Sequence, residues 1–547
     1  MTEKRQILRS ASVIAVVTAI SRICGYLRDQ RIALLLGTSG AADALVLAFR
    51  IPSMIRRMVA EGSLGASFIP IFAKYLRERP PSEAWAFAQK VFWDMAAILA
   101  VIAVAGSVFS RQVVYLFTLL GGHTVRWDLA VTLNRFIFPS VLFLVMAALA
   151  GAVLNCFHIF GLPAATPIFF NLTLIAASLG VVYGPLLARL PERLRTPAVP
   201  LALAILVGSA LQLAVQLPAL WRQGMRFAPE VSFTDPGVRK VGALMGPSFF
   251  GMGVYQVNLF VDTLFATSPR MPAGSVMSLY LGDRVMQLVL GSYAIAMSTA
   301  LLPTMARQVA AGEYAEMKRT FAFALRVVSF IAVPAAVGLI LLRRPIIQVL
   351  FQHGQFVAES TALTARALMY YSLGLPAFAA IKLITPMYYS AQDTMTPARV
   401  GAWALVMNVA LNAFFLLALV RVLANGGPAL ASSIAAYFNF AVLFLIFRRR
   451  YGRLGGRAIA RAAARIGVCA GVMAAACIAG TKLALAPVLL GAERHFLSQV
   501  AMLAVVVTAS AAVYLGLARI LHCEELGELF LLFRRGDAEA AGGGAER

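Results

Sequence analysis

Arginine side chains are concentrated in two stretches of the sequence that are otherwise apolar. The five arginines concerned are Arg22, Arg28, Arg50, Arg56 and Arg57. A charged side chain at the centre of a bilayer costs about 2.5–3.5 kcal/mol, so four or five of them facing lipid would cost on the order of 10 kcal/mol. We therefore expect these side chains to line a water-filled cavity, and a cationic cavity in a membrane protein favours an anionic guest.

The charges of the second apolar stretch have a helical spacing. Asp43, Arg50 and Arg57 are seven residues apart, so on a continuous helix they lie within about 40° of one another. Glu61 follows Arg57 by one turn, where it can pair with it. Pro52 is expected to kink the helix, which would let Arg56 and Arg57 exchange places on that face.

Two further predicted spans contribute polar side chains to the candidate substrate site. These residues are Ser21, Arg22, Arg28, Asp29, Arg284 and Gln287. Arginine suits planar oxyanions such as phosphate because its guanidinium group donates two parallel hydrogen bonds. The alternative is that these charges form ion pairs that hold helices together. The surplus of arginines over nearby carboxylates favours an anion site for the set, whereas for Arg28 and Asp29 the sequence favours neither reading.

The composition identifies the class of protein. The chain has 547 residues, of which 60% are hydrophobic and 13% are charged, which indicates an all-α polytopic membrane protein. The apolar runs are about 20 residues long, too long for the strands of a β-barrel. The net charge is +24, but most Lys and Arg lie between apolar runs, which is typical of the cytoplasmic loops of membrane proteins. With no soluble domain, nucleic-acid binding is not expected.

No sequence motif indicates an enzyme. The five cysteines and five histidines show no metal-ligand spacing, and no HExxH, nucleophile elbow or P-loop is present. A membrane enzyme acting on polyprenyl phosphates would need clustered acidic ligands or a His/Asp pair at a span end. We therefore expect a transporter that needs no cofactor.

We predict about 14 membrane spans, with both termini in the cytoplasm because cytoplasmic ends and loops then hold the excess of Lys and Arg. The spans are expected near 10–28, 38–60, 84–109, 129–155, 162–185, 199–221, 241–266, 275–303, 320–342, 363–390, 396–420, 427–447, 460–486 and 497–519.

A faint internal repeat relates the two halves of the chain. The segment 67–73 recurs as 300–306, and Asp29 is matched by Asp262, at an offset of about 230 residues, or six spans. Six is even, so the two six-helix lobes form a parallel repeat, as in alternating-access transporters. The predicted domains are an N-lobe at 1–235, a C-lobe at 236–455, spans 13 and 14 at 456–522, and a partly disordered cytoplasmic tail at 523–547.

Several motifs resemble those of the MurJ (MviN) family of lipid II flippases, which belongs to the MOP exporter superfamily. Nearly the whole chain takes part, through the segments 21–29, 42–62, 162–171, 283–287, 333–338, 349–356 and 388–397. Two positions depart from the family pattern: Ser53 stands where the family has Asn, and Val289 where it has Pro.

The resemblance implies a flippase of the bacterial inner membrane. It would carry lipid II, the undecaprenyl-diphosphate-linked peptidoglycan precursor, from the cytoplasmic to the periplasmic leaflet. The residues implied to contact the diphosphate and sugar are Arg22, Arg28, Arg56 and Arg284, supported by Asp43 and Glu61. Spans 13 and 14 would form a groove for the polyprenyl tail. The expected partners are lipid II, membrane lipids and cell-wall synthesis proteins.

The resemblance also implies a sodium site in the C-terminal lobe, for which Asp262, Asn408 and Asn412 could supply ligands. Two other cargo classes remain open at this point. One is another polyprenyl-diphosphate oligosaccharide, and the other is the cargo of a cation-coupled exporter of the same superfamily. A drug exporter for cationic guests prefers acidic and aromatic cavity residues, which the arginines argue against.

Overall fold

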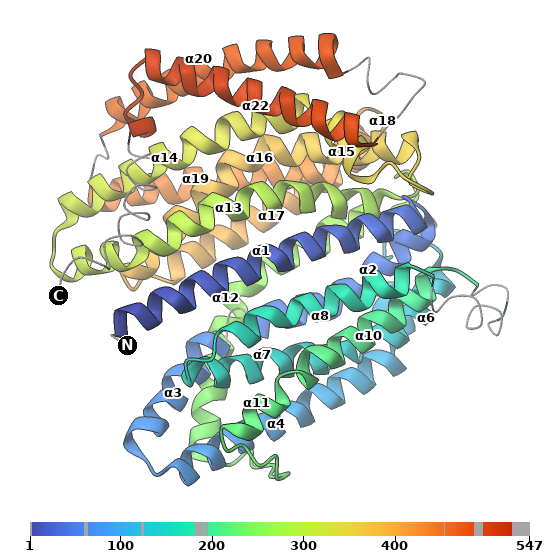
Figure 1. Cartoon of the computed structure of the whole chain (residues 1–547), viewed down its shortest axis with the longest axis vertical. Coiled ribbons are helices and arrows are strands. Elements are labelled where there is room, and N and C mark those ends of the chain that lie inside the picture. The colour runs from blue at the N-terminus through green and yellow to red at the C-terminus, as the bar shows by residue number, and fades with distance from the viewer. Residues whose placement is uncertain are drawn as a thin grey trace. The chain divides into compact units, whose positions relative to one another are not determined.

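The computed structural model is helical in the residues that it describes, which are 3–59, 64–121, 125–180, 191, 195–452, 455–485 and 496–527 (Figure 1). The chain divides into two compact units. The first comprises Met1–Met277 with His353–Phe356, and the second comprises Ser278–Gln352 with Val357–Arg547.

The first unit contains the helices up to α12. They are α1 (Glu3–Leu36), α2 (Gly40–Arg56), α3 (Leu64–Glu78), α4 (Pro81–Val108), α5 (Ser110–Phe117), α6 (Trp127–Ile137), α7 (Ser140–Cys156), α8 (Gly161–Ser178), α10 (Ala198–Ala214), α11 (Leu217–Arg222) and α12 (Pro236–Ala266).

The second unit begins three residues into α13 and contains the remaining described helices. They are α13 (Ser275–Ala310), α14 (Tyr314–Leu341), α15 (Arg343–Phe351), α16 (Ala358–Ser390), α17 (Met395–Ala418), α18 (Val420–Leu423), the 3-10 turn η3 (Ala424–Gly426), α19 (Gly427–Tyr451), α20 (Gly456–Gly480), the π-helical η4 (Thr481–Leu485) and α22 (Phe496–Ile520).

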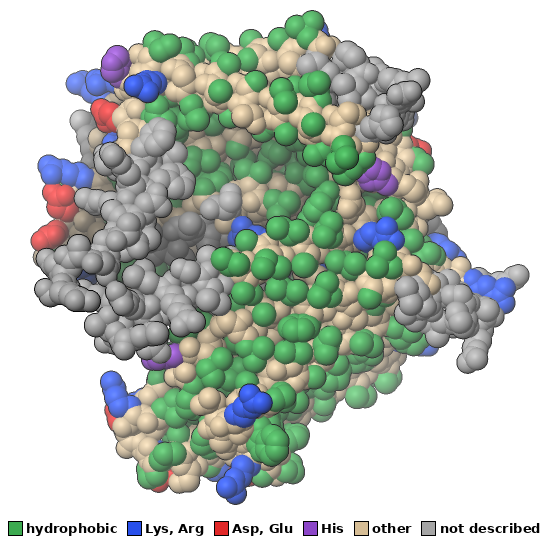
Figure 2. Space-filling model, viewed as in Figure 1, with side chains coloured by type: hydrophobic (Ala, Val, Ile, Leu, Met, Phe, Trp, Pro, Cys, Tyr) green, Lys and Arg blue, Asp and Glu red, His purple; other side chains and the backbone are tan. Residues whose placement is uncertain are grey.

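Ten segments among the described residues are helical, long and apolar enough to cross a membrane. They coincide with ten of the predicted spans, so the class of polytopic helical membrane protein is confirmed and the predicted count is confirmed in part. On the face that Figure 2 shows, hydrophobic side chains cover most of the helices' length, as a lipid-facing surface requires.

The other four predicted spans coincide with α1, α2, α12 and α13, and their crossing of the membrane stays a prediction. The regular part of α2 has 17 residues. At 1.5 Å per residue it is about 26 Å long, slightly less than the hydrocarbon core of a bilayer. These four helices carry most of the candidate site, including Arg22, Arg56, Asp262 and Arg284.

Aromatic packing forms the core of the first unit at α3, α4 and α7. Phe68 and Phe72 on α3 are fully buried, and their ring centroids lie 5.3 Å apart. Trp85 on α4 stacks on Phe157 at 5.2 Å. Because α12 packs against α3 and α4, it lies in the first unit although it follows the predicted N-lobe in sequence. The predicted lobes rest on the repeat rather than on packing, and they stay a prediction.

In the second unit, α16 packs between α14 and α19, and α20 packs on α14 and α22. The Tyr514 hydroxyl of α22 donates a hydrogen bond of 2.8 Å to the Phe330 carbonyl of α14. Arg326 of α14 forms an ion pair of 2.9 Å with Glu524, just beyond α22. The pair of helices predicted as spans 13 and 14 is therefore fastened to α14, while their role as a tail groove stays a prediction.

Candidate functional site

Helix α2 changes geometry where its arginines lie. The helix runs through Pro52, which has no N–H group to donate to the preceding turn, and the Ser53 hydroxyl donates to the Arg50 carbonyl at 2.7 Å. After Arg56 the chain continues as a π-helical turn at residues 57–59. An extra residue in the turn rotates the side chains that follow, and such turns are common at functional sites.

The arginines of α2 and of the turn that follows it are partly exposed. Arg50, Arg56 and Arg57 are half-buried, and Arg22 on α1 is exposed. All four belong to the first unit. Glu61, which the sequence predicts to pair with Arg57, lies outside the described residues, so that pairing stays a prediction.

Arg28 has a different environment from the other arginines because it is buried between α1 and α8. It is 7% exposed, and Asp29 beside it is 5% exposed. Its Nε and Nη2 atoms donate to Asp29 Oδ1 at 3.0 and 2.6 Å, and its Nη1 donates to Asn171 Oδ1 at 2.9 Å. The Asn171 amide donates in turn to the Ser21 carbonyl at 3.2 Å. This network joins the two helices, as the ion-pair alternative predicts for this pair.

Asp43 caps the N-terminus of α13 within the first unit. The carboxylate is fully buried, and its oxygens accept hydrogen bonds from the backbone N–H groups of Gly274, at 2.9 Å, and Met277, at 2.7 Å. A carboxylate at this position satisfies N–H groups that have no partner inside the helix. Gly274 has a φ of +83°, and a Cβ atom there would lie 2.1 Å from the Thr38 carbonyl oxygen, so only glycine fits this approach.

The candidate residues of α13 interact with neighbours on their own helix. The Arg284 guanidinium lies 5.3 Å from the Tyr280 ring centre, and its Nε donates to the Tyr280 hydroxyl at 3.2 Å. The Gln287 amide donates to Asp283 at 3.4 Å. These contacts orient the Arg284 side chain, which lies in the second unit and is half-buried.

The residues predicted to bind sodium belong to two units. Asn408 and Asn412 on α17 are buried in the second unit, where the Asn412 amide donates to Asn408 Oδ1 at 3.0 Å and the Asn408 amide donates to Ser432 at 3.1 Å. Asp262 is buried in the first unit. Among the described residues no three His, Cys, Asp or Glu side chains form a metal-binding group. The sodium site stays a prediction.

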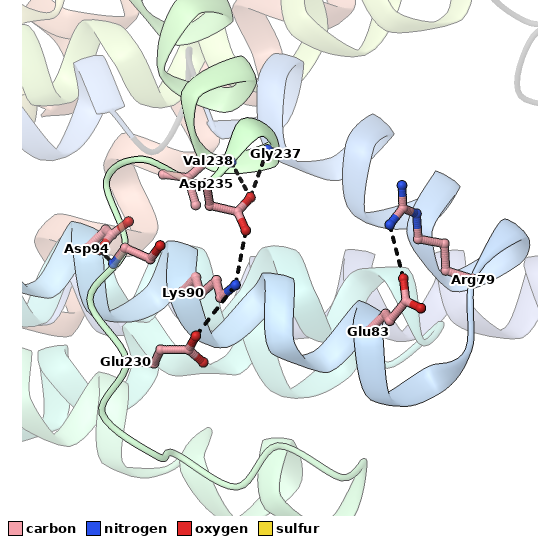
Figure 3. A network of polar contacts seen from close by, with 9 residues as sticks. Arg79, Glu83, Lys90, Asp94, Glu230, Asp235, Gly237 and Val238 are labelled. Carbon is pink, nitrogen blue, oxygen red and sulfur yellow. Dashed lines mark hydrogen bonds and ion pairs between the residues drawn. The ribbon is translucent and has the colours of Figure 1, made fainter.

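Sequence reasoning missed two contacts of the site and one polar network. Asn171 lies 143 residues from Arg28, and Tyr280 is one turn before Arg284, a spacing that could have indicated the contact. Lys90 of α4 forms a network with Glu230 and Asp235, which precede α12 in the chain (Figure 3). The sequence Asp235-Pro236 is a helix-start signal that could have located part of it.

Comparison with known proteins identifies the family. A family model described as lipid II flippase MurJ matches residues 32–496. A relative from Vibrio cholerae, a probable lipid II flippase MurJ, is 32% identical over 452 residues, covering 81% of this chain and 83% of the relative. The lipid II flippase MurJ of Burkholderia cenocepacia is 32% identical over 450 residues, covering 81% of this chain and 84% of the relative.

Solved structures show a related fold. The lipid II flippase MurJ in its inward closed conformation matches with a TM-score of 0.71 at 23% identity, covering 93% of this chain and 99% of that chain. An inward-facing multidrug resistance MATE transporter of the MOP superfamily matches with a TM-score of 0.64 at 15% identity, covering 80% of this chain and 98% of that chain. The chain therefore has the MurJ/MATE-like fold of a multi-pass membrane transporter and belongs to the MurJ family of lipid II flippases.

Proposed function

We propose that this protein moves lipid II from the cytoplasmic to the periplasmic leaflet of the bacterial inner membrane by alternating access. The observation that carries the proposal is the cluster of exposed and half-buried arginines on α1, on α2 and in the turn after α2, in a chain that matches the MurJ family over residues 32–496. A diphosphate carries the negative charge and the planar oxygen geometry that guanidinium groups bind.

The arginines have two different roles in this proposal. Arg22, Arg50, Arg56, Arg57 and Arg284 are the arginines that supply hydrogen-bond donors to the diphosphate. Arg28 already donates three hydrogen bonds to Asp29 and Asn171, so it acts by fixing α1 against α8. Asp29 and Asp43 support the site by holding the neighbouring helices in place, and Ser21 and Gln287 supply further polar groups.

The membrane potential drives the return of the empty carrier. An inside-negative potential contributes about 2.3 kcal/mol per elementary charge per 100 mV, which favours the inward-facing state of an empty cationic cavity. The diphosphate enters this cavity, neutralises the arginines and removes their mutual repulsion, so the two lobes can close and reopen outward. The polyprenyl tail stays in lipid beside α20 and α22. With both termini in the cytoplasm, the basic segment at 448–465 lies on the cytoplasmic side.

The test is a transport assay with purified protein in liposomes that contain lipid II. Arg22→Ala, Arg56→Ala and Arg284→Ala should each lower the rate about 10-fold or more, because each removes charge-assisted hydrogen bonds to the diphosphate. Arg79→Ala is the matched control, since Arg79 is exposed and pairs with Glu83 at the protein surface. An inside-negative potential should accelerate repeated turnover of the wild type.

Three results would contradict parts of the proposal. Full activity in all three arginine variants would show that these arginines do not bind the diphosphate. Transport of a different polyprenyl-diphosphate oligosaccharide in place of lipid II would keep the mechanism and change the cargo. An undiminished rate after collapse of the potential would remove the proposed return step.

A further inference from the structure

The segment between α11 and α12 is the covalent link from the predicted N-lobe to the rest of the chain. We refer to residues 223–235 as the connector. In Figure 3 it passes α4, and the carboxylates of Glu230 and Asp235 point toward Lys90 of that helix. A segment that links two moving lobes is expected to be a hinge with few tertiary contacts, and the connector has many.

The first part of the connector is packed into the core of the first unit. A Cβ atom at Gly224, which has a φ of +109°, would lie 2.9 Å from the Trp85 indole nitrogen. Met225 is fully buried among the core residues. The ring of Phe227 meets the edge of Phe92 of α4 at 5.8 Å. These contacts fix the start of the connector against α4, the helix that the second part of the connector also contacts.

The second part of the connector is hydrogen-bonded to α4 through its backbone. The N–H of Ala228 donates to Gln89 Oε1 at 3.2 Å, and the N–H of Ser232 donates to Asp94 Oδ1 at 2.7 Å. Asp94 is 3% exposed. A charge-assisted bond to a buried carboxylate is about twice as strong as a neutral one.

Lys90 fastens the end of the connector. Its ammonium group lies 3.0 Å from Asp235 Oδ2 and 3.5 Å from Glu230 Oε1, and the side chains of Lys90 and Asp235 are 22% and 21% exposed. The other oxygen of Asp235 accepts hydrogen bonds from the N–H groups of Gly237, at 2.8 Å, and Val238, at 3.4 Å. A single carboxylate therefore joins α4 to the first turn of α12.

The first turn of α12 packs against two aromatic rings. A Cβ atom at Gly237 would lie 2.9 Å from the Phe87 ring and from the Tyr75 hydroxyl, and these two rings stack at 4.5 Å. The glycine permits an approach that any larger residue would prevent. Burial alone would raise the pKa of Asp235, but hydrogen bonds from Lys90, Gly237 and Val238 outweigh it and lower the pKa. Asp235 is therefore ionised at neutral pH.

From these contacts we propose that Lys90 is a positioning residue that clamps the connector and the first turn of α12 to α4. On this proposal, which rests on the alternating-access function above, the start of α12 moves with α4 during transport. The flexible point between the moving parts then lies beyond this turn and not in the connector.

The first experiment measures hydrogen exchange in the purified protein, which needs no transport. Lys90→Met keeps the length of the side chain and removes its charge, so Asp235 and Glu230 lose the ammonium group that they contact. We expect the amides of Ala228 and Ser232 to exchange about 10-fold faster in this variant, and Lys90→Arg to restore slow exchange. Unchanged exchange in Lys90→Met would overturn the clamp.

The second experiment tests the role in transport by cross-linking. Gln89→Cys and Ala228→Cys are introduced into a chain whose five native cysteines are replaced, and the pair is joined by a short bifunctional maleimide. We expect the cross-linked protein to transport lipid II within about twofold of the uncross-linked protein, because the clamp already holds these residues together. A loss of 10-fold or more on cross-linking would show that the connector moves, and would overturn the proposal.

Two readouts separate a positioning role from a merely structural one. Lys90→Met should lower the transport rate several-fold while lipid II binding to the purified protein stays within about twofold, and Lys90→Arg should restore the rate. An unchanged rate in Lys90→Met would show that the clamp has no role in transport. If the wild type itself moves no lipid II, the proposed function fails, whereas the hydrogen-exchange result still decides the clamp.

Discussion

Replacement of Arg28 distinguishes a structural arginine from a substrate-binding one. Arg28 is 7% exposed and donates two hydrogen bonds to Asp29, at 3.0 and 2.6 Å, and one to Asn171, at 2.9 Å. Arg28→Met keeps the apolar volume but takes the Arg28 guanidinium away from the buried Asp29 carboxylate. Removing one member of a buried ion pair costs about 3–5 kcal/mol.

The double variant Arg28→Met/Asp29→Leu supplies the magnitude of the coupling. It removes both charges, so the remaining cost is about 1 kcal/mol for the Asn171 oxygen that loses its donor. The single variant should therefore be about 3 kcal/mol less stable than the double variant. Arg22→Met on the same helix is the control, because an exposed side chain changes stability by about 0.5 kcal/mol or less.

The assay is the free energy of unfolding in bicelles, measured beside lipid II binding by the folded fraction. We expect Arg28→Met to lose stability while its folded fraction binds lipid II normally. Arg22→Met should show the reverse. If Arg28→Met is as stable as the wild type and binds lipid II 10-fold more weakly, Arg28 contacts the substrate and our reading of this ion pair is wrong.

Three further predictions concern other carboxylates. Asp43→Ala should lower the free energy of unfolding by about 2–4 kcal/mol, because α13 loses its cap, while the affinity for lipid II stays within about twofold. Calorimetry measures the first quantity and a binding titration the second. Normal stability with lost affinity would contradict this prediction. Burial alone would raise the pKa of Asp393, but hydrogen bonds from Thr396 and Arg450 outweigh it and lower the pKa. The stabilisation that the ionised Asp393 carboxylate provides is therefore complete above its usual pKa of about 3.9, and it is lost as the pH falls through the lower pKa of the folded protein. Asp393→Asn should thus be less stable than the wild type at pH 7 and equally stable in strong acid. Asp262→Ala should abolish any sodium dependence of transport, and full sodium dependence in that variant would remove the predicted site.

Hydropathy was sufficient to locate the apolar helices. The ten segments that are apolar enough to cross a membrane match predicted spans such as 84–109 and 363–390, since a run of about 20 apolar residues has few alternatives. Helices with charges inside them were located correctly as helices, but their charge content weakens the same signal. For α2 the sequence predicts a kink at Pro52, which stays a prediction, whereas the π-helical turn at 57–59 was not expected from the sequence.

Residue roles that depend on distant partners could not be read from local spacing. Asp43 shares a helical spacing with Arg50, yet its partners are N–H groups 231 and 234 residues away. The sequence leaves two roles open for Arg28 because its partner Asn171 is on another helix. Lys90 was overlooked because its partner Asp235 is 145 residues away and only the fold brings them together. Periodicity defines the face of a helix, whereas tertiary packing decides what that face meets.

The central claim is tested most directly in cells whose only copy of this protein is under repressible control. The quantity measured is the amount of lipid-linked cell-wall precursor that a periplasmic probe can reach. We predict that depletion removes accessible precursor and raises the cytoplasmic pool, and that the wild type restores it whereas Arg56→Ala, inserted at the same level, does not. Unchanged accessibility on depletion would contradict the claim that this protein flips lipid II.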